Sequence, residues 1–161
     1  MKFVIRKIVE TDIPAIIALM REFAEYENLA EYFDITEARL YAAMFGEGSF
    51  VEGLIARDGE TAAGYALFYP SFASFRGQRG LFLEDIYVRA EYRRHALGQA
   101  LLKEIARSGR ARGFERIDFQ VLDWNIPAIE FYKKHGASSD GTTRHFKFTD
   151  SAFDRLSEPP G

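Results

Sequence analysis

The chain has 161 residues, 47% of them hydrophobic and 15 of them phenylalanine, so we expect one domain over residues 1–161 with a sizeable core. Its formal net charge of −3 disfavours nucleic acid and anionic membranes as partners and mildly favours cationic ligands. It has no cysteine, which excludes disulfide bonds, thiolate metal sites and covalent catalysis through a cysteine.

The N-terminal segment predicts a strand and then a helix. Residues 3–8 alternate like a strand, and no stretch approaches the roughly 18 apolar residues of a membrane span, so we expect a soluble, cytoplasmic protein. Thr11 and Asp12 offer a cap for a helix that ends near Tyr26 and Glu27. Apolar residues recur on one face of that helix: Ile13, Ile16, Ile17, Met20, Phe23 and Ala24.

The next segment predicts a short helix and a hairpin. Thr36 can cap the helix, which glycines at 46 and 48 terminate before a strand over residues 50–56. Asp58 and Gly59 indicate a tight turn into a strand over residues 62–72. The glycine-bearing segment 75–80 then leads into the next strand, residues 82–88.

The C-terminal half predicts two helices and two strands. A helix is expected over 97–111 and a strand over 117–122. Asn125 can cap a helix that reaches Lys134, with Pro127 in its first turn and Gly136 as its stop. A last strand is expected over residues 143–148, and the tail from about residue 157 should fray. The whole chain therefore predicts an α+β domain on a mostly antiparallel sheet.

The loop between residues 88 and 97 feeds a helix N-terminus, which is a ready anion site. Unpaired backbone N–H groups and the positive end of the helix dipole both favour a ligand such as a pyrophosphate. Gly98 permits close backbone approach, and Arg93 and Arg94 add positive charge.

The order of these pieces resembles the GNAT superfamily of N-acetyltransferases. Its pyrophosphate loop reads Gln/Arg-x-x-Gly-x-Gly/Ala, and here the loop reads Arg93-x-x-Ala96-x-Gly98. The chain is most similar to the diamine (spermidine/spermine) N-acetyltransferases, through FAEYE, LEDIYV, EYRR, Trp124-Asn125 and FYKKHGA in matching order over roughly residues 2–148. It departs from the family at Ala96, where a glycine is usual.

The resemblance implies the GNAT fold and acetyl-CoA as cosubstrate. In that fold the strands ending near residues 88 and 122 splay apart, and the thioester sits between them. The implied cofactor-binding residues are Ile86, Tyr87, Val88, Arg93, Arg94, His95, Ala96, Leu97, Gly98, Asn125 and Lys134. Among them, backbone N–H groups near 86–88 are suited to hold the carbonyl oxygen as it gains charge, and Asn125 matches a residue that hydrogen-bonds the pantetheine arm.

Two residues are candidates for the proton transfers. An acceptor amine with a pKa near ~10.4 must lose a proton before it attacks, and the resemblance assigns this to Glu84, directly or through water. Strand alternation predicts that Glu84 and Asp85 point to opposite faces of the sheet. The alternative role for Glu84 is a structural ion pair with an arginine. Tyr132 matches the family's general acid for the leaving thiolate, and the alternative is a packing role.

Substrate contacts are expected from Tyr26 and Glu27, which match a Tyr-Glu pair that holds the distal amine in the polyamine enzymes. Asp85 is expected to join them, and Glu31 and Asp34 are further candidates for an acidic rim. The diamine enzymes are homodimers, so the resemblance also implies a homodimer.

Other chemistry is not indicated. The three histidines, at 95, 135 and 145, show no metal spacing, so we expect no metal. Arginines at 107, 110, 112 and 116 lie where a helix ends and complement its dipole.

The leading hypothesis is an acetyl-CoA-dependent N-acetyltransferase that acts by direct attack in a ternary complex on a small polyamine, diamine or lysine-like amine. One alternative keeps the cofactor but changes the acceptor to an amino acid analogue, an aminoglycoside or a protein N-terminus. The other is a non-catalytic acyl-CoA-binding protein.

Overall fold

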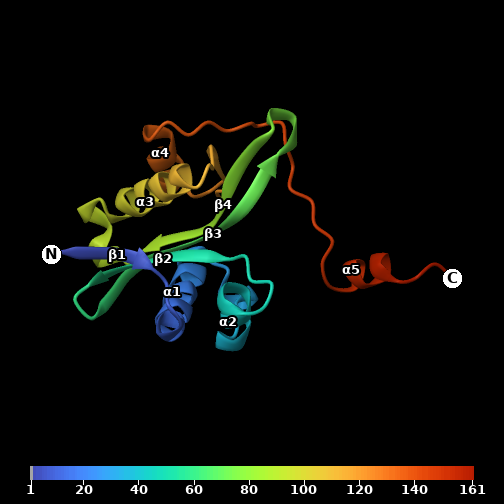
Figure 1. The fold of residues 1–161 in the computed structure, drawn as a ribbon, viewed down its shortest axis with the longest axis horizontal. Coiled ribbons are helices and arrows are strands. Elements are labelled where there is room, and N and C mark those ends of the chain that lie inside the picture. Colours follow the sequence, from blue (N-terminus) through green and yellow to red (C-terminus); the bar gives the residue numbers. More distant parts are fainter. Residues whose placement is uncertain (1) are drawn as a thin grey trace. The chain divides into compact units, whose positions relative to one another are not determined.

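The computed structural model describes residues 2–161, which form two compact units, residues 2–120 and residues 121–161. The first unit is built on a five-stranded sheet in the order β1-β2-β3-β4-β5 (Figure 1). Its strands are β1 Phe3–Lys7, β2 Glu52–Asp58, β3 Thr61–Ala73, β4 Gln78–Val88 and β5 Arg116–Phe119. The first three pairings are antiparallel and only β4 and β5 run parallel, so the mixed, mostly antiparallel sheet is confirmed.

Helices pack on both faces of this sheet (Figure 1). Alternation along β2 and β3 divides their side chains: Ile55, Tyr65 and Leu67 pack with α1 (Ile13–Tyr26) and α2 (Glu37–Phe45). The intervening Leu54 and Phe68 pack with α3 (Leu97–Ala111) on the other face. Each face therefore has its own apolar core.

Short 3₁₀ helices complete the connections of the first unit: η1 Glu10–Asp12, η2 Ala30–Tyr32, η3 Ser74–Arg76 and η4 Ala90–His95. Thr36 caps α2 as expected, because its Oγ1 accepts a hydrogen bond from the Arg39 amide at 3.2 Å. The expected turn between β2 and β3 is also present, with Gly59 at a φ of 57°.

The second unit contains α4 (Ile126–Lys134) and α5 (Asp150–Ser157). The expected strand over residues 143–148 is wrong: these residues form neither helix nor strand, and α5 follows them instead. Their alternation of polar and aromatic side chains is typical of a strand, but the one sheet of the described residues does not include them. The strand expected over 117–122 is shorter and earlier, as β5.

Asp12 does not cap α1 in the expected way, because its carboxylate joins an ion cluster. Arg6 donates to both carboxylate oxygens at 2.6 and 3.0 Å, and Arg57 donates to Oδ1 at 3.0 Å. The amide of Val9 donates to Oδ2 at 2.9 Å. With only 2% of its surface exposed, the carboxylate fastens β1, η1 and β2 together. These hydrogen bonds, the one from Arg6 first, hold its pKa well below the usual range.

We predict that Asp12→Asn lowers the free energy of unfolding by about 2–3 kcal/mol, because two guanidinium groups lose their shared anion. The folded-state pKa is depressed, so this contribution is present above the unfolded pKa near ~3.9 and fades as pH falls below it. Urea unfolding at neutral and acidic pH measures it. Asp34→Asn, at an exposed aspartate, is the matched control. Equal unfolding midpoints for the two variants would contradict the role of the cluster.

Candidate active site

A β-bulge in β4 builds the centre of the candidate site. Leu83 pairs with Phe68 and Asp85 pairs with Leu67, so two consecutive residues of β3 face three of β4. Glu84 is the additional residue. Bulges of this kind redirect side chains and occur often beside active sites.

The bulge places both acids toward the same face of the sheet, so the expectation of opposite faces is wrong. Tyr65 donates a hydrogen bond from its hydroxyl to Oδ2 of Asp85 at 2.8 Å. Tyr69, four residues later on the same face of β3, is influenced by the charge and hydrogen bonding of Glu84. Simple alternation fails here because the inserted residue resets the period of two.

Glu84 is exposed and makes no ion pair with an arginine among residues 2–161. The structural alternative of a Glu84–arginine pair is therefore not realised. It is Glu22 of α1 that holds an arginine of this region, Arg89, which donates to both of its carboxylate oxygens at 2.8–3.1 Å. Glu84 instead shares a hydrogen bond with the hydroxyl of Tyr69.

A third carboxylate comes from Glu27, at the C-terminal end of α1. Burial raises the pKa of Glu27, and its charge acts on both Tyr65 and Asp85. Burial, followed by the charges of Glu84 and Glu27, raises the pKa of Asp85 to about 6, while the hydrogen bond from Tyr65 opposes the increase. Three carboxylates therefore share one electrostatic environment, which we call the acidic site: Glu27, Glu84 and Asp85.

Tyr26, expected to accompany Glu27, is covered on its ring by a guanidinium. The Arg93 guanidinium carbon lies 4.6 Å from the centre of the Tyr26 ring and 5.6 Å from that of Tyr87. Nε of Arg93 also donates to the carbonyl of Val88 at 2.9 Å. Arg93 therefore joins the predicted cofactor loop to the end of α1. Glu31 and Asp34, the other rim candidates, are exposed, and neither is among the charges that act on the acidic site.

The predicted pyrophosphate loop is η4 followed by the first turn of α3. Ala96 is the N-cap of α3 and has a left-handed conformation, with φ of 54° and ψ of 24°. No side-chain cap satisfies the N-terminal amides of α3 in the described chain, so these donors fit an anion. Arg94 and His95 are exposed, whereas Leu97 is buried in the core and can offer only its backbone.

The open edge of β4 begins at the bulge. Its ladder with β5 covers only Gly80 to Leu83, so residues 84–88 have no strand on that side within the described chain. Val88 is buried and Ile86 packs against the core below α3, so these residues can offer backbone groups on this edge. Such unpaired N–H groups fit a carbonyl oxygen that gains negative charge.

The remaining candidates belong to the second unit. Asn125 caps α4 as expected: its Oδ1 accepts from the Ala128 amide at 3.3 Å, which leaves its side-chain NH₂ as the group for a ligand. Tyr132 is half-buried on α4, with its ring 5.2 Å from that of Phe131. Lys134, the exposed last residue of α4, lies two positions later and so roughly 200° around the helix from Tyr132.

A family model described as the acetyltransferase (GNAT) family matches residues 13–137, a span that contains the bulge, the loop and α4. The chain belongs to the GNAT acetyltransferase family. The expected fold and the expected class of enzyme, an N-acetyltransferase, are thereby confirmed. Acetyl-CoA is the family's cosubstrate, and the unsatisfied amides of α3 fit its phosphates.

Two relatives are similar in sequence to this acetyltransferase. Thialysine N-epsilon-acetyltransferase from Bos taurus is 39% identical over 83% of this chain and 82% of its own. Spermidine/spermine N(1)-acetyltransferase-like protein 1 from Homo sapiens is 30% identical over 91% of this chain but only 22% of its own length. Among solved structures, an integron cassette protein from the mobile metagenome of V. cholerae superposes with a TM-score of 0.82, at 20% identity and 99% coverage of both chains. That likeness supports the fold alone.

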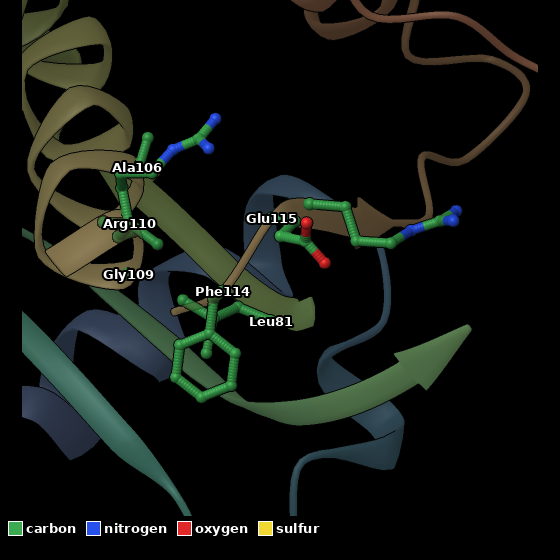
Figure 2. Close-up of a pocket in the computed structure, with 8 residues that line it drawn as sticks. Leu81, Ala106, Gly109, Arg110, Phe114 and Glu115 are labelled. Carbon is green, nitrogen blue, oxygen red and sulfur yellow. The ribbon is translucent and has the colours of Figure 1, made fainter. Parts of the chain in front are cut away.

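A cavity of about 130 Å³ lies elsewhere on the first unit (Figure 2). Its lining residues come from β4, the end of α3, the connection that follows α3 and the start of β5, and include Leu81, Gly109 and Phe114. Gly109 follows Leu97 by twelve residues, or about 18 Å along α3. Arg116, which also lines it, is paired with Asp118 at 2.7 and 2.8 Å. The cavity is therefore separate from the cofactor loop of this acetyltransferase.

Two other expectations concern metals and membranes. Residues 2–161 contain no group of three or more histidine, aspartate or glutamate side chains placed to hold a metal ion. In the same range, no helix combines the length and the apolar character that crossing a bilayer requires.

Sequence reasoning missed Tyr65. The signal was available: a tyrosine within the apolar run of β3 carries a hydroxyl that must find a partner once it is buried. What the sequence could not supply was the partner, because the bulge decides that Asp85 faces the same side.

We predict that Ala96→Gly raises the free energy of unfolding by about 0.5–1 kcal/mol. A left-handed alanine costs about 1–2 kcal/mol, from which the greater freedom of glycine in the unfolded chain subtracts part. Acetyl-CoA should bind about two- to fivefold more tightly in calorimetry, because the loop adopts its left-handed conformation at position 96 in a larger fraction of the molecules. Ala106→Gly, in the helical interior of α3, is the control and should lose about 1 kcal/mol. An Ala96→Gly variant with unchanged stability and affinity would show that the loop accepts alanine without strain.

Proposed function

We propose that this acetyltransferase transfers the acetyl group of acetyl-CoA to a primary amine of a small polyamine, diamine or lysine-like acceptor. The observation that carries the proposal is the acidic site, where Glu27, Glu84 and Asp85 share one electrostatic environment beside the open edge of β4. Relatives named for thialysine and for spermidine/spermine support the same class of acceptor.

The acidic site suits a cationic acceptor because each carboxylate lowers the energy of an ammonium group nearby. Glu27 and Asp85 lie in partly buried surroundings, where screening by water is weaker than at the surface. A neutral acceptor would leave their charges uncompensated. Tyr26 contributes at the same helix end, with Arg93 over its ring.

Acetyl-CoA supplies a thioester carbonyl that an unprotonated amine can attack. Glu84 takes the proton from the acceptor ammonium, directly or through water, since it is exposed and without an arginine partner. Asp85 and Glu27 hold the acceptor in place. The amides on the open edge near residues 86–88 stabilise negative charge on the carbonyl oxygen.

The loop of the first unit supplies the pyrophosphate contacts. The unsatisfied amides at the start of α3, which include Leu97 and Gly98, bind the pyrophosphate together with Arg94. The family resemblance, rather than the geometry of the second unit, assigns contacts with the rest of the cofactor to Asn125 and Lys134. It likewise assigns to the hydroxyl of Tyr132 the proton that the departing thiolate takes up.

A homodimer is part of the proposal. The diamine enzymes that the sequence resembles are homodimers, and residues 143–148 have the alternation of a strand, a form in which two copies can pair. Several phenylalanines are exposed in the described chain and would be covered by such a contact: Phe72, Phe75, Phe146, Phe148 and Phe153. Light scattering should give the mass of two chains, and the mass of one chain would refute the dimer.

The test of function is release of free thiol from acetyl-CoA with a panel of amines: spermidine, putrescine, thialysine, lysine, an aminoglycoside and a peptide N-terminus. We expect turnover with a polyamine, diamine or lysine-like amine. Turnover only with the aminoglycoside or the peptide would overturn the acceptor class. Tight acetyl-CoA binding without any turnover would favour a sensor instead.

With the best acceptor of that panel, Tyr132→Phe should slow turnover by roughly 10²-fold, the usual scale for a general acid, and leave acetyl-CoA affinity unchanged. Glu84→Gln should do the same on the acceptor side. Tyr41→Phe removes a hydroxyl from a partly exposed tyrosine of α2 and serves as the control. Unchanged turnover in either test variant removes that residue from the mechanism.

A further inference from the structure

Tyr65 is a fully buried tyrosine on β3 whose hydroxyl makes a hydrogen bond with Asp85. Its side chain has no exposed surface and lies in the core formed with α1 and α2. The hydroxyl donates to Oδ2 of Asp85 at 2.8 Å. A phenylalanine would fill the same space, so the hydroxyl serves the carboxylate rather than the packing.

Asp85 depends on this contact. Within residues 2–161, no arginine or lysine pairs with its carboxylate, and Tyr65 is its only hydrogen-bond partner. Oδ1 has no hydrogen-bond partner in the described chain and keeps some exposure to solvent. One oxygen of Asp85 is therefore held by the buried hydroxyl of Tyr65, and the other is open to a further partner.

We propose that Tyr65 is a positioning residue for the acceptor: its buried hydroxyl fixes Oδ2 of Asp85 so that Oδ1 meets the acceptor ammonium. The inference rests on the proposed function, since it requires an amine at the acidic site. It adds a residue from the core of β3 to a site otherwise built from β4 and the end of α1.

The Tyr65 hydroxyl helps to keep Asp85 ionised, because the charged groups near Asp85 oppose its ionisation. Glu27 from α1 and Glu84 from β4 both carry like charge, while Tyr65 from β3 is the one group that favours the ionised carboxylate. Tyr87 of β4 acts on Tyr65 rather than on Asp85. Burial and the two carboxylates raise the pKa of Asp85 to about 6, and loss of the hydroxyl would raise it further.

Below about pH 6, Asp85 is protonated and no longer attracts an ammonium group, so kcat/KM for the amine falls toward acid. With Tyr65→Phe the carboxylate stays protonated to a higher pH. The acid limb of the kcat/KM profile should therefore shift upward by about one pH unit, with the main change in KM for the amine.

The experiment compares kcat/KM profiles from about pH 5 to about pH 9 for the unmodified enzyme, Tyr65→Phe and Tyr41→Phe, with acetyl-CoA affinity measured alongside. Tyr41 is a partly exposed tyrosine of α2 whose ring packs on Phe45, outside the acidic site and the predicted cofactor loop, so its variant controls for loss of a tyrosine hydroxyl. We expect the limb to move only in Tyr65→Phe. A limb that stays in place overturns the inference.

Asp85→Asn provides a second test that does not depend on whether Tyr65→Phe folds normally. This isosteric change should remove the step near pH 6 from the kcat/KM profile, and adding Tyr65→Phe to it should cause no further change in KM. Persistence of that step in Asp85→Asn, or an equal effect of Tyr65→Phe in both backgrounds, overturns the positioning role. Failure of the proposed function would look different: the unmodified enzyme would acetylate no amine at any pH.

Discussion

One additional residue in β4 determines the chemistry of this surface. Because Glu84 is inserted opposite the Leu67–Phe68 step of β3, two adjacent acids point toward one face instead of two. The same irregularity coincides with the end of the β4–β5 ladder, where the open edge of β4 begins. The acidic site and a row of unpaired backbone donors thus begin at the same position, which is the arrangement that the proposed acyl transfer to an amine requires.

The acidic site also depends on how α1 is held, since Glu27 lies at its end. Arg89 links this helix to the sheet by donating to Glu22 and to the carbonyl of Ala62 at 2.8 Å. At the other end of α1, the Asp12 cluster fixes the helix start to β1 and β2. Two ion clusters therefore position the helix whose end contributes Glu27 to the acidic site. Arg93 also helps to hold the end of α1, because its contacts with Tyr26 and Val88 join the predicted cofactor loop to this helix.

Local signals predicted much of the fold. The helix over 97–111 matches α3 at both ends, and α1 ends at Tyr26 as expected, because apolar periodicity and stop residues act within a few positions. The strand over 143–148 failed because pairing is a long-range property that alternation alone does not supply. The orientation of Glu84 and Asp85 failed for a related reason: a bulge depends on the register with the neighbouring strand. Likewise, Ala96 was marked as unusual by the family pattern, but its positive φ came only from the fold.

The most direct measurement is the titration of the Asp85 carboxyl by carbon NMR on aspartate-labelled protein, with Asp85→Asn to assign the resonance. If the acidic site is as described, the midpoint lies near pH 6 and moves lower when a saturating acceptor amine is added, because an ammonium group favours the ionised carboxylate. A midpoint near the ordinary value of 3.8 that no amine displaces would show that Asp85 is neither buried among like charges nor in contact with the acceptor.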